Sequence, residues 1–115
     1  MTVTVLPLPP ALEKSAALRP LLEQAGEWVA ALIDEYDWPT PVSVDWYPIA
    51  NGDGETLIGA RVTDGVAVAH GLFRPADLAE GGVTIRRFNP ILRALIAATI
   101  DEQERLARRV PAEAA

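Results

Sequence analysis

His70 is the only histidine of the sequence, and histidine is the side chain whose ordinary pKa lies closest to neutrality. A proposal of general acid–base chemistry therefore begins with this residue. Asp64-Gly65 separates two runs of alternating residues and predicts a hairpin, in which Arg61 and His70 would share one face of a sheet. Asp45, on a preceding strand, could lie on the same sheet. These three side chains are the predicted site for an anionic ligand, with Arg61 as the anion contact.

The alternative is that His70 lies on the sheet surface with no chemical task, and the residue types favour it. The only serines, Ser15 and Ser43, do not lie in a nucleophile elbow, and there is no cysteine. One histidine and no thiolate also exclude the usual zinc sites within one chain. The run Asn51–Glu55 alternates oxygen ligands as a calcium loop does, but Thr56 stands where that loop needs glycine, so we predict a turn. We expect no catalytic residues, no cofactor and no metal.

Large aromatic residues gather between positions 36 and 47, where aspartates and prolines separate them. Tryptophan and tyrosine anchor many protein interfaces, and they also fill many cores. Trp38, Trp46 and Tyr47 are therefore candidate interface residues. We expect Trp28 and one of the other two tryptophans to belong to the core.

Thr99 and Gln103 interrupt the apolar stripe of the last predicted helix. A polar side chain buried in such a stripe needs a hydrogen-bond partner, which another helix or subunit often supplies. We therefore predict Thr99 and Gln103 as further interface residues. The alternative is that water partly covers the stripe at these positions.

Two segments have the spacing of long amphipathic helices. Residues 11–36 carry apolar side chains at alternating intervals of four and three, at Leu18, Leu22, Ala25, Val29, Leu32 and Tyr36. Pro20 should divide this segment into a short helix and a longer one that starts at Pro20 itself. The second helix should begin at Asn89-Pro90, with the asparagine as its cap, and end before Pro111.

Several segments are predicted to be extended, namely Thr2–Leu6, Thr40–Pro48, Thr56–Thr63, Val66–Phe73 and, as a further strand, Val83–Phe88. If Asp64-Gly65 forms a two-residue loop, Thr63 pairs with Val66 and Gly59 with His70. Alternation then gives the hairpin one face of small or apolar residues, against which helices can pack. These are Ile58, Ala60, Val62, Ala67, Ala69 and Gly71.

The elements together predict a single α+β domain, in which two long helices pack on one face of an antiparallel sheet of three to five strands. The element order is β-α-β-β-β-turn-β-α. A chain of 115 residues is long enough for one compact core. Residues 1–10 would form an extended, proline-rich arm, residues 11–110 the domain and residues 111–115 a frayed tail.

Charge is unevenly distributed along the chain, whose net charge is −6. Residues 1–60 contain two basic and nine acidic residues, a charge of −7, and residues 61–115 contain eight arginines and seven acidic residues, a charge of +1. Because arginine and lysine supply most of the affinity for a polyanion, we expect no nucleic-acid partner. No segment resembles a signal peptide or a membrane span. We expect a soluble cytoplasmic protein, or a virion component if the origin is a phage.

Two functional hypotheses follow. The first is a small non-enzymatic interaction or assembly protein, which contacts copies of itself or another protein through its proline-rich arm, aromatic cluster and amphipathic helices, as a phage or other multi-subunit assembly requires. The second is a small-molecule binding protein or enzyme that takes an anion near Arg61 and His70. The lack of a catalytic set favours the first. A pocket beside His70 would support the second.

Overall fold

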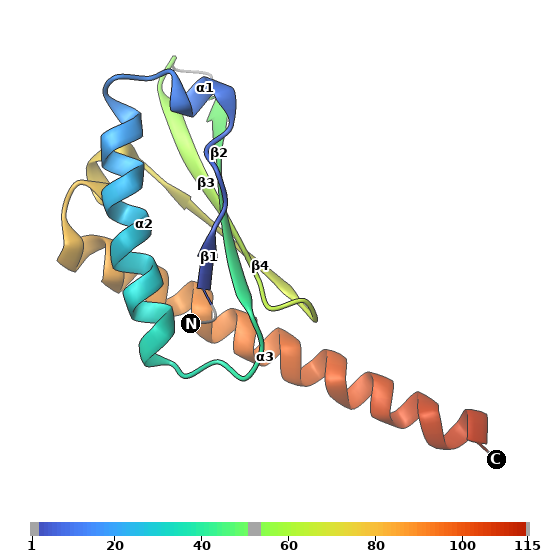
Figure 1. Ribbon diagram of the computed structural model, residues 1–115. Coiled ribbons are helices and arrows are strands. Elements are labelled where there is room, and N and C mark those ends of the chain that lie inside the picture. The colour runs from blue at the N-terminus through green and yellow to red at the C-terminus, as the bar shows by residue number, and fades with distance from the viewer. Residues whose placement is uncertain (1–2, 51–53, 115) are drawn as a thin grey trace.

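Four strands form one mixed sheet in the computed structural model, which describes residues 3–50 and 54–114, with side chains up to residue 109 (Figure 1). Across the sheet the order is β1 (Val3–Val5), β2 (Val42–Ala50), β3 (Thr56–Thr63) and β4 (Val68–Phe73). β3 is antiparallel to both of its neighbours, β2 and β4, whereas β1 runs parallel to β2. The predicted α+β class is confirmed, but the prediction of a wholly antiparallel sheet is wrong.

The parallel pairing of β1 follows from the helices that connect it to β2. These helices are α1 (Pro10–Glu13) and α2 (Leu18–Glu35). Neighbouring parallel strands need a crossover of a dozen or more residues, usually a helix, and α2 returns the chain to the end of the sheet where β1 begins (Figure 1). The predicted turn around residues 51–53 lies outside the described residues.

α2 begins at Leu18, before the predicted start at Pro20. Ser15 explains the earlier start, because its hydroxyl oxygen accepts a hydrogen bond from the backbone N–H of Leu18 at 3.1 Å. Pro20 still lies in the first turn, where backbone N–H groups have no helical partner. The proline therefore removes no hydrogen bond from α2.

One helix, α3 (Gly81–Ala114), runs through the predicted strand Val83–Phe88 and through Asn89-Pro90. The predicted strand and the predicted helix start at Asn89 are both wrong. The buried positions have helical rather than alternating spacing, at Thr84, Phe88, Leu92 and Leu95. α3 also continues through Pro111, beyond the end predicted for it.

A short 3₁₀ turn, η1 (Pro75–Leu78), precedes α3 and stands where the predicted element order has a turn. The hydroxyl of Thr84 donates to the carbonyl oxygen of Glu80 at 2.9 Å and to that of Asp77 at 3.1 Å. These bonds tie the first turn of α3 to η1, which explains why the helix begins well before the proline.

The β3–β4 hairpin keeps the predicted faces but not the predicted register. Arg61 pairs with His70, two residues away from the register predicted for a two-residue loop. Asp64 widens the loop, because its carboxylate accepts the backbone N–H groups of Val66 and Ala67, each at 3.0 Å. A displacement of two residues leaves every side chain on the same face, since the side chains of a strand alternate.

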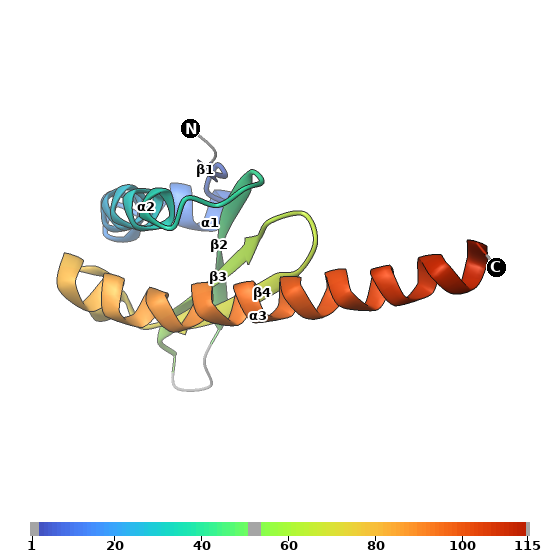
Figure 2. The same ribbon diagram turned by 90° about the horizontal axis from the view of Figure 1, so that it is seen from below.

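Both long helices pack on one face of the sheet, α2 beside β1 and β2, and α3 beside β3 and β4 (Figure 2). Three aromatic rings fill the core between them. Phe73 stacks on Phe88 with ring centroids 5.6 Å apart, and Trp46 meets both rings edge-on. Gly71 lets α3 approach closely, because a Cβ atom there would lie 2.2 Å from the Cδ1 atom of Ile91.

The C-terminal part of α3 extends beyond the sheet and beyond α2 (Figures 1 and 2). With 34 residues the helix is about 51 Å long. The molecule measures 58 Å along its longest axis and 31 and 22 Å along the others. Part of α3 therefore has none of the other described elements beside it (Figures 1 and 2). Among the described residues, no helix has both the length and the apolar character needed to cross a membrane.

Candidate functional site

The three residues predicted to bind an anion lie side by side in one row across the sheet. Asp45 on β2 pairs with Arg61 on β3, which pairs in turn with His70 on β4. The row lies on the face opposite the helices, where Arg61 and His70 are exposed. The fold thus brings the predicted residues together, and anion binding by them stays a prediction.

Tyr47, a predicted interface residue, lies beside this row and contacts His70. Its hydroxyl oxygen is 3.2 Å from His70 Nδ1. Its ring lies over Gly59, on the strand between them, where a Cβ atom would come within 2.3 Å of the ring carbons. The contact between Tyr47 and His70 therefore needs a glycine at this position.

Replacing Gly59 with alanine should push the Tyr47 ring off the sheet and separate its hydroxyl from His70. We expect a loss of about 1–2 kcal/mol of unfolding free energy, as for other substitutions that overfill a packed position. The NMR resonances of the His70 ring should also move, because the aromatic neighbour is displaced. Gly82→Ala is the control, since a Cβ atom there meets nothing within 4 Å. Unchanged His70 resonances in Gly59→Ala would contradict this account.

Three further predicted interface residues, Trp38, Thr99 and Gln103, line one pocket between α3 and the segment after α2. The pocket has a volume of about 210 Å³. Its other lining residues are Tyr36, Pro39, Thr40, Asp64, Val66, Ile96 and Ile100. The sequence indicates these candidates through two separate features, an aromatic cluster and a helix stripe, and the fold places them together.

Asp64 connects the walls of this pocket and is only 4% exposed. Its Oδ2 atom accepts the indole N–H of Trp38 at 3.2 Å and the hydroxyl of Thr99 at 2.6 Å. Its Oδ1 atom accepts the backbone N–H groups of Val66 and Ala67. One carboxylate thus joins the β3–β4 loop, the segment after α2 and the middle of α3.

Burial by itself raises the pKa of Asp64, but the hydrogen bonds to its carboxylate, that from Thr99 first, outweigh this effect and hold the pKa below its ordinary value. The group is therefore ionised at neutral pH. Because both oxygens are occupied by donors of the protein, its role is to position the pocket walls. The sequence indicates Asp64 only as a turn residue, and no local signal points to its distant partners.

Trp46, the remaining predicted interface residue, lies in the core and is 1% exposed. It shares the inward face of β2 with Val42 and Val44. Trp28, predicted to be core, is only partly buried and packs over Gly81 at the start of α3. The expectation of a core tryptophan besides Trp28 is met by Trp46 and also by Trp38, which is 8% exposed, whereas Trp28 itself only packs against the core.

The apolar stripe of α3 continues past the pocket into the projecting part of the helix. Ile100, at the pocket, is 49% exposed, and Leu106, further along, is 46% exposed. Gln103 lies between them on the same side of the helix. We call the pocket residues together with Leu106 the α3 surface.

No protein family model matches the chain, and no curated protein matches its sequence. In the part of the chain that the structure describes, no three His, Asp or Glu side chains come together in a group that could hold a metal ion. Arg61 and His70 do not line the pocket at α3. The α3 surface is therefore the better developed of the two candidate sites.

Proposed function

We propose that this protein is a small, non-enzymatic interaction protein that assembles with a second copy of itself through the α3 surface. The projection of α3 beyond the sheet, with Ile100 and Leu106 half exposed, is the observation that supports this most directly. Single exposed apolar residues are common on protein surfaces. Two large ones beside a pocket on one helix face are typical of an interaction site.

The charges of the projecting segment favour a second copy in antiparallel orientation. Acidic residues come first along the helix and arginines follow. They are Asp101, Glu102, Glu104, Arg105, Arg108 and Arg109. In an antiparallel pair the acidic part of each helix lies beside the basic part of the other. A two-fold axis between the copies therefore produces two equivalent sets of attractive charge contacts. A parallel pair would bring like charges together.

The same contact suits a subunit of a larger assembly, such as a phage particle, in the cytoplasm or in the virion. The proline-rich residues 6–9 then offer a second contact, since Leu6 is 37% exposed. The paired copies would supply the repeating unit, and the arm would join one unit to the next.

Light scattering across a micromolar concentration series tests the proposal. We expect a dimer, and we expect Leu106→Glu to weaken it about tenfold or more, because a carboxylate replaces an apolar side chain that the contact buries. Ala94→Glu adds the same charge at an exposed position on the opposite side of α3 from Gln103 and should leave the dimer intact. A wild-type protein that stays monomeric throughout, or equal effects of the two substitutions, would refute the proposal.

A further inference from the structure

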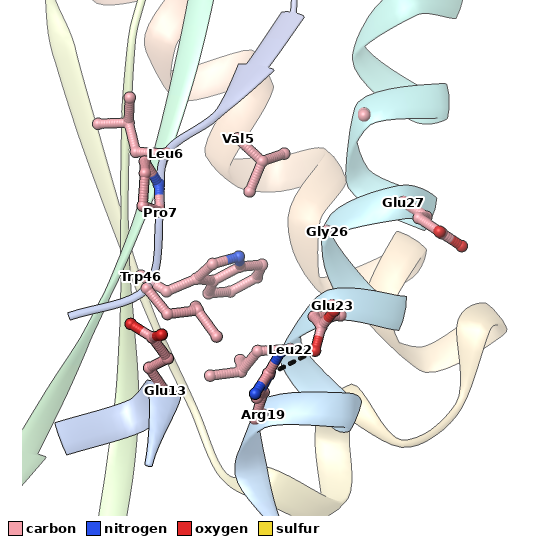
Figure 3. Close-up of a pocket in the computed structure, with 12 residues that line it drawn as sticks. Val5, Leu6, Pro7, Glu13, Arg19, Leu22, Glu23, Gly26, Glu27 and Trp46 are labelled. Carbon is pink, nitrogen blue, oxygen red and sulfur yellow. Dashed lines mark hydrogen bonds and ion pairs between the residues drawn. The ribbon is translucent and has the colours of Figure 1, made fainter. Parts of the chain in front are cut away.

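A second cavity, a groove of about 450 Å³, opens between β1 and α2 (Figure 3). Val5, Leu22 and Trp46 supply part of its apolar lining. Its volume is in the range of pockets that bind small molecules. It shares no lining residue with the α3 surface.

The indole nitrogen of Trp46 lies at this groove and has no hydrogen-bond partner. Among the described residues, Trp46 Nε1 is the one buried side-chain nitrogen or oxygen atom that lacks a hydrogen-bond partner. Such unpaired groups are rare in folded proteins because each is unfavourable. Figure 3 shows the nitrogen directed toward the space between Val5 and Gly26. A single water molecule there would find few other partners, since neither residue has a polar side chain.

Gly26 lies beside the same nitrogen, in the interior of α2. Glycine destabilises a helix interior relative to alanine. A Cβ atom at this position would lie 3.4 Å from a methyl group of Val5 and 3.8 Å from Trp46 Nε1, which are ordinary contacts. Packing therefore does not require glycine here. The glycine leaves room next to the unpaired indole N–H, at the expense of helix stability.

The charged residues that line the groove are mainly acidic. They are Glu13, Arg19, Glu23 and Glu27. Arg19 Nε is already paired with Glu23 Oε1 at 3.1 Å. Because the carboxylates outnumber the single guanidinium, the groove attracts positive charge.

We propose that this groove binds a free small organic cation with an apolar body and a hydrogen-bond acceptor at its inner end. The acceptor takes the indole N–H of Trp46, the apolar body lies against Val5 and Leu22, and the cationic group lies among the glutamates. Val5 belongs to an edge strand of three residues, so a small movement of its side chain opens the N–H to the groove.

Three probes separate the parts of this proposal in an NMR titration that follows the indole N–H of Trp46. para-Acetylphenethylammonium has the ketone, the ring and the charge. para-Ethylphenethylammonium lacks the oxygen, and para-acetylphenylethanol lacks the charge. We expect saturable binding of the first probe with a downfield shift of the Trp46 N–H signal, and roughly tenfold weaker binding of each of the others.

Gly26→Ala distinguishes a binding role from a structural one. The melting temperature should rise by about 3–6 °C, because alanine suits the helix better. Binding of para-acetylphenethylammonium should fall roughly tenfold, because the new methyl group occupies the space beside the indole N–H. Gly82→Ala is again the control and should leave binding unchanged, since Gly82 lies outside the groove. Wild-type affinity in Gly26→Ala, or no saturable binding of this probe to the wild type, would overturn the proposal.

Discussion

Asp64→Ala should lower the unfolding free energy by about 3–4 kcal/mol. The substitution removes the acceptor of hydrogen bonds from Trp38, Thr99 and two backbone N–H groups, and these bonds are buried or partly buried. Urea unfolding at neutral pH measures the loss. Asp34→Ala, at an exposed position of α2, should change stability by no more than about 0.5 kcal/mol. Similar losses for the two variants would show that Asp64 does not join the three segments.

The same carboxylate predicts how stability depends on pH. Its pKa is lowered in the folded protein from the ordinary value of 3.8, so the ionised form stabilises the fold at every pH above that value. This contribution is lost as the pH falls through the lower pKa of the folded state. The stability difference between the wild type and Asp64→Asn should therefore stay constant near neutrality and shrink below about pH 4. A difference that grows on acidification would contradict the lowered pKa.

Phe88→Ala should lower the unfolding free energy by about 3–5 kcal/mol, the usual result of emptying a buried aromatic position. Phe88 is 0% exposed and packs against the rings of both Phe73 and Trp46. Comparing the unfolding free energies of Phe88→Ala and Arg86→Ala by chemical denaturation tests whether this segment is a helix. In a strand, residues 86 and 88 would share one face, whereas in α3 they point in different directions.

We expect Arg86→Ala to change stability by about 0.5 kcal/mol or less, because its side chain is exposed. Comparable losses in both variants would favour the strand predicted from the sequence. A large loss confined to Phe88→Ala would support the helix that the structure has.

The α+β class and the faces of the hairpin follow from local patterns. Alternation over β3 and β4 is sufficient to place Ile58 and Val62 inside and Arg61 and His70 outside. The pattern cannot reveal the register, because a displacement of two residues preserves it. That displacement depends on the side chain of Asp64, which caps its own loop.

Residues 83–88 show where local patterns are ambiguous. The three consecutive β-branched residues at 83–85 fit a strand, yet Thr84 and Phe88 also have helical spacing. The helix rather than the strand is stabilised by contacts with residues distant in sequence, namely those of Phe88 with the rings of Phe73 and Trp46. The three residues of β1 do not indicate its direction by themselves, whereas the helical crossover predicted between β1 and β2 favours a parallel pairing.

Residue pattern alone is sufficient to predict the amphipathic face of α2, the inward and outward sides of the strands, and the residue types available to the candidate sites. It does not predict which of those residues meet in the folded chain. Trp38 and Thr99 share one carboxylate although both are far from Asp64 in sequence. Periodicity records the orientation of each element relative to the core. Which elements become neighbours depends on packing among distant segments, and a local pattern contains no information about that.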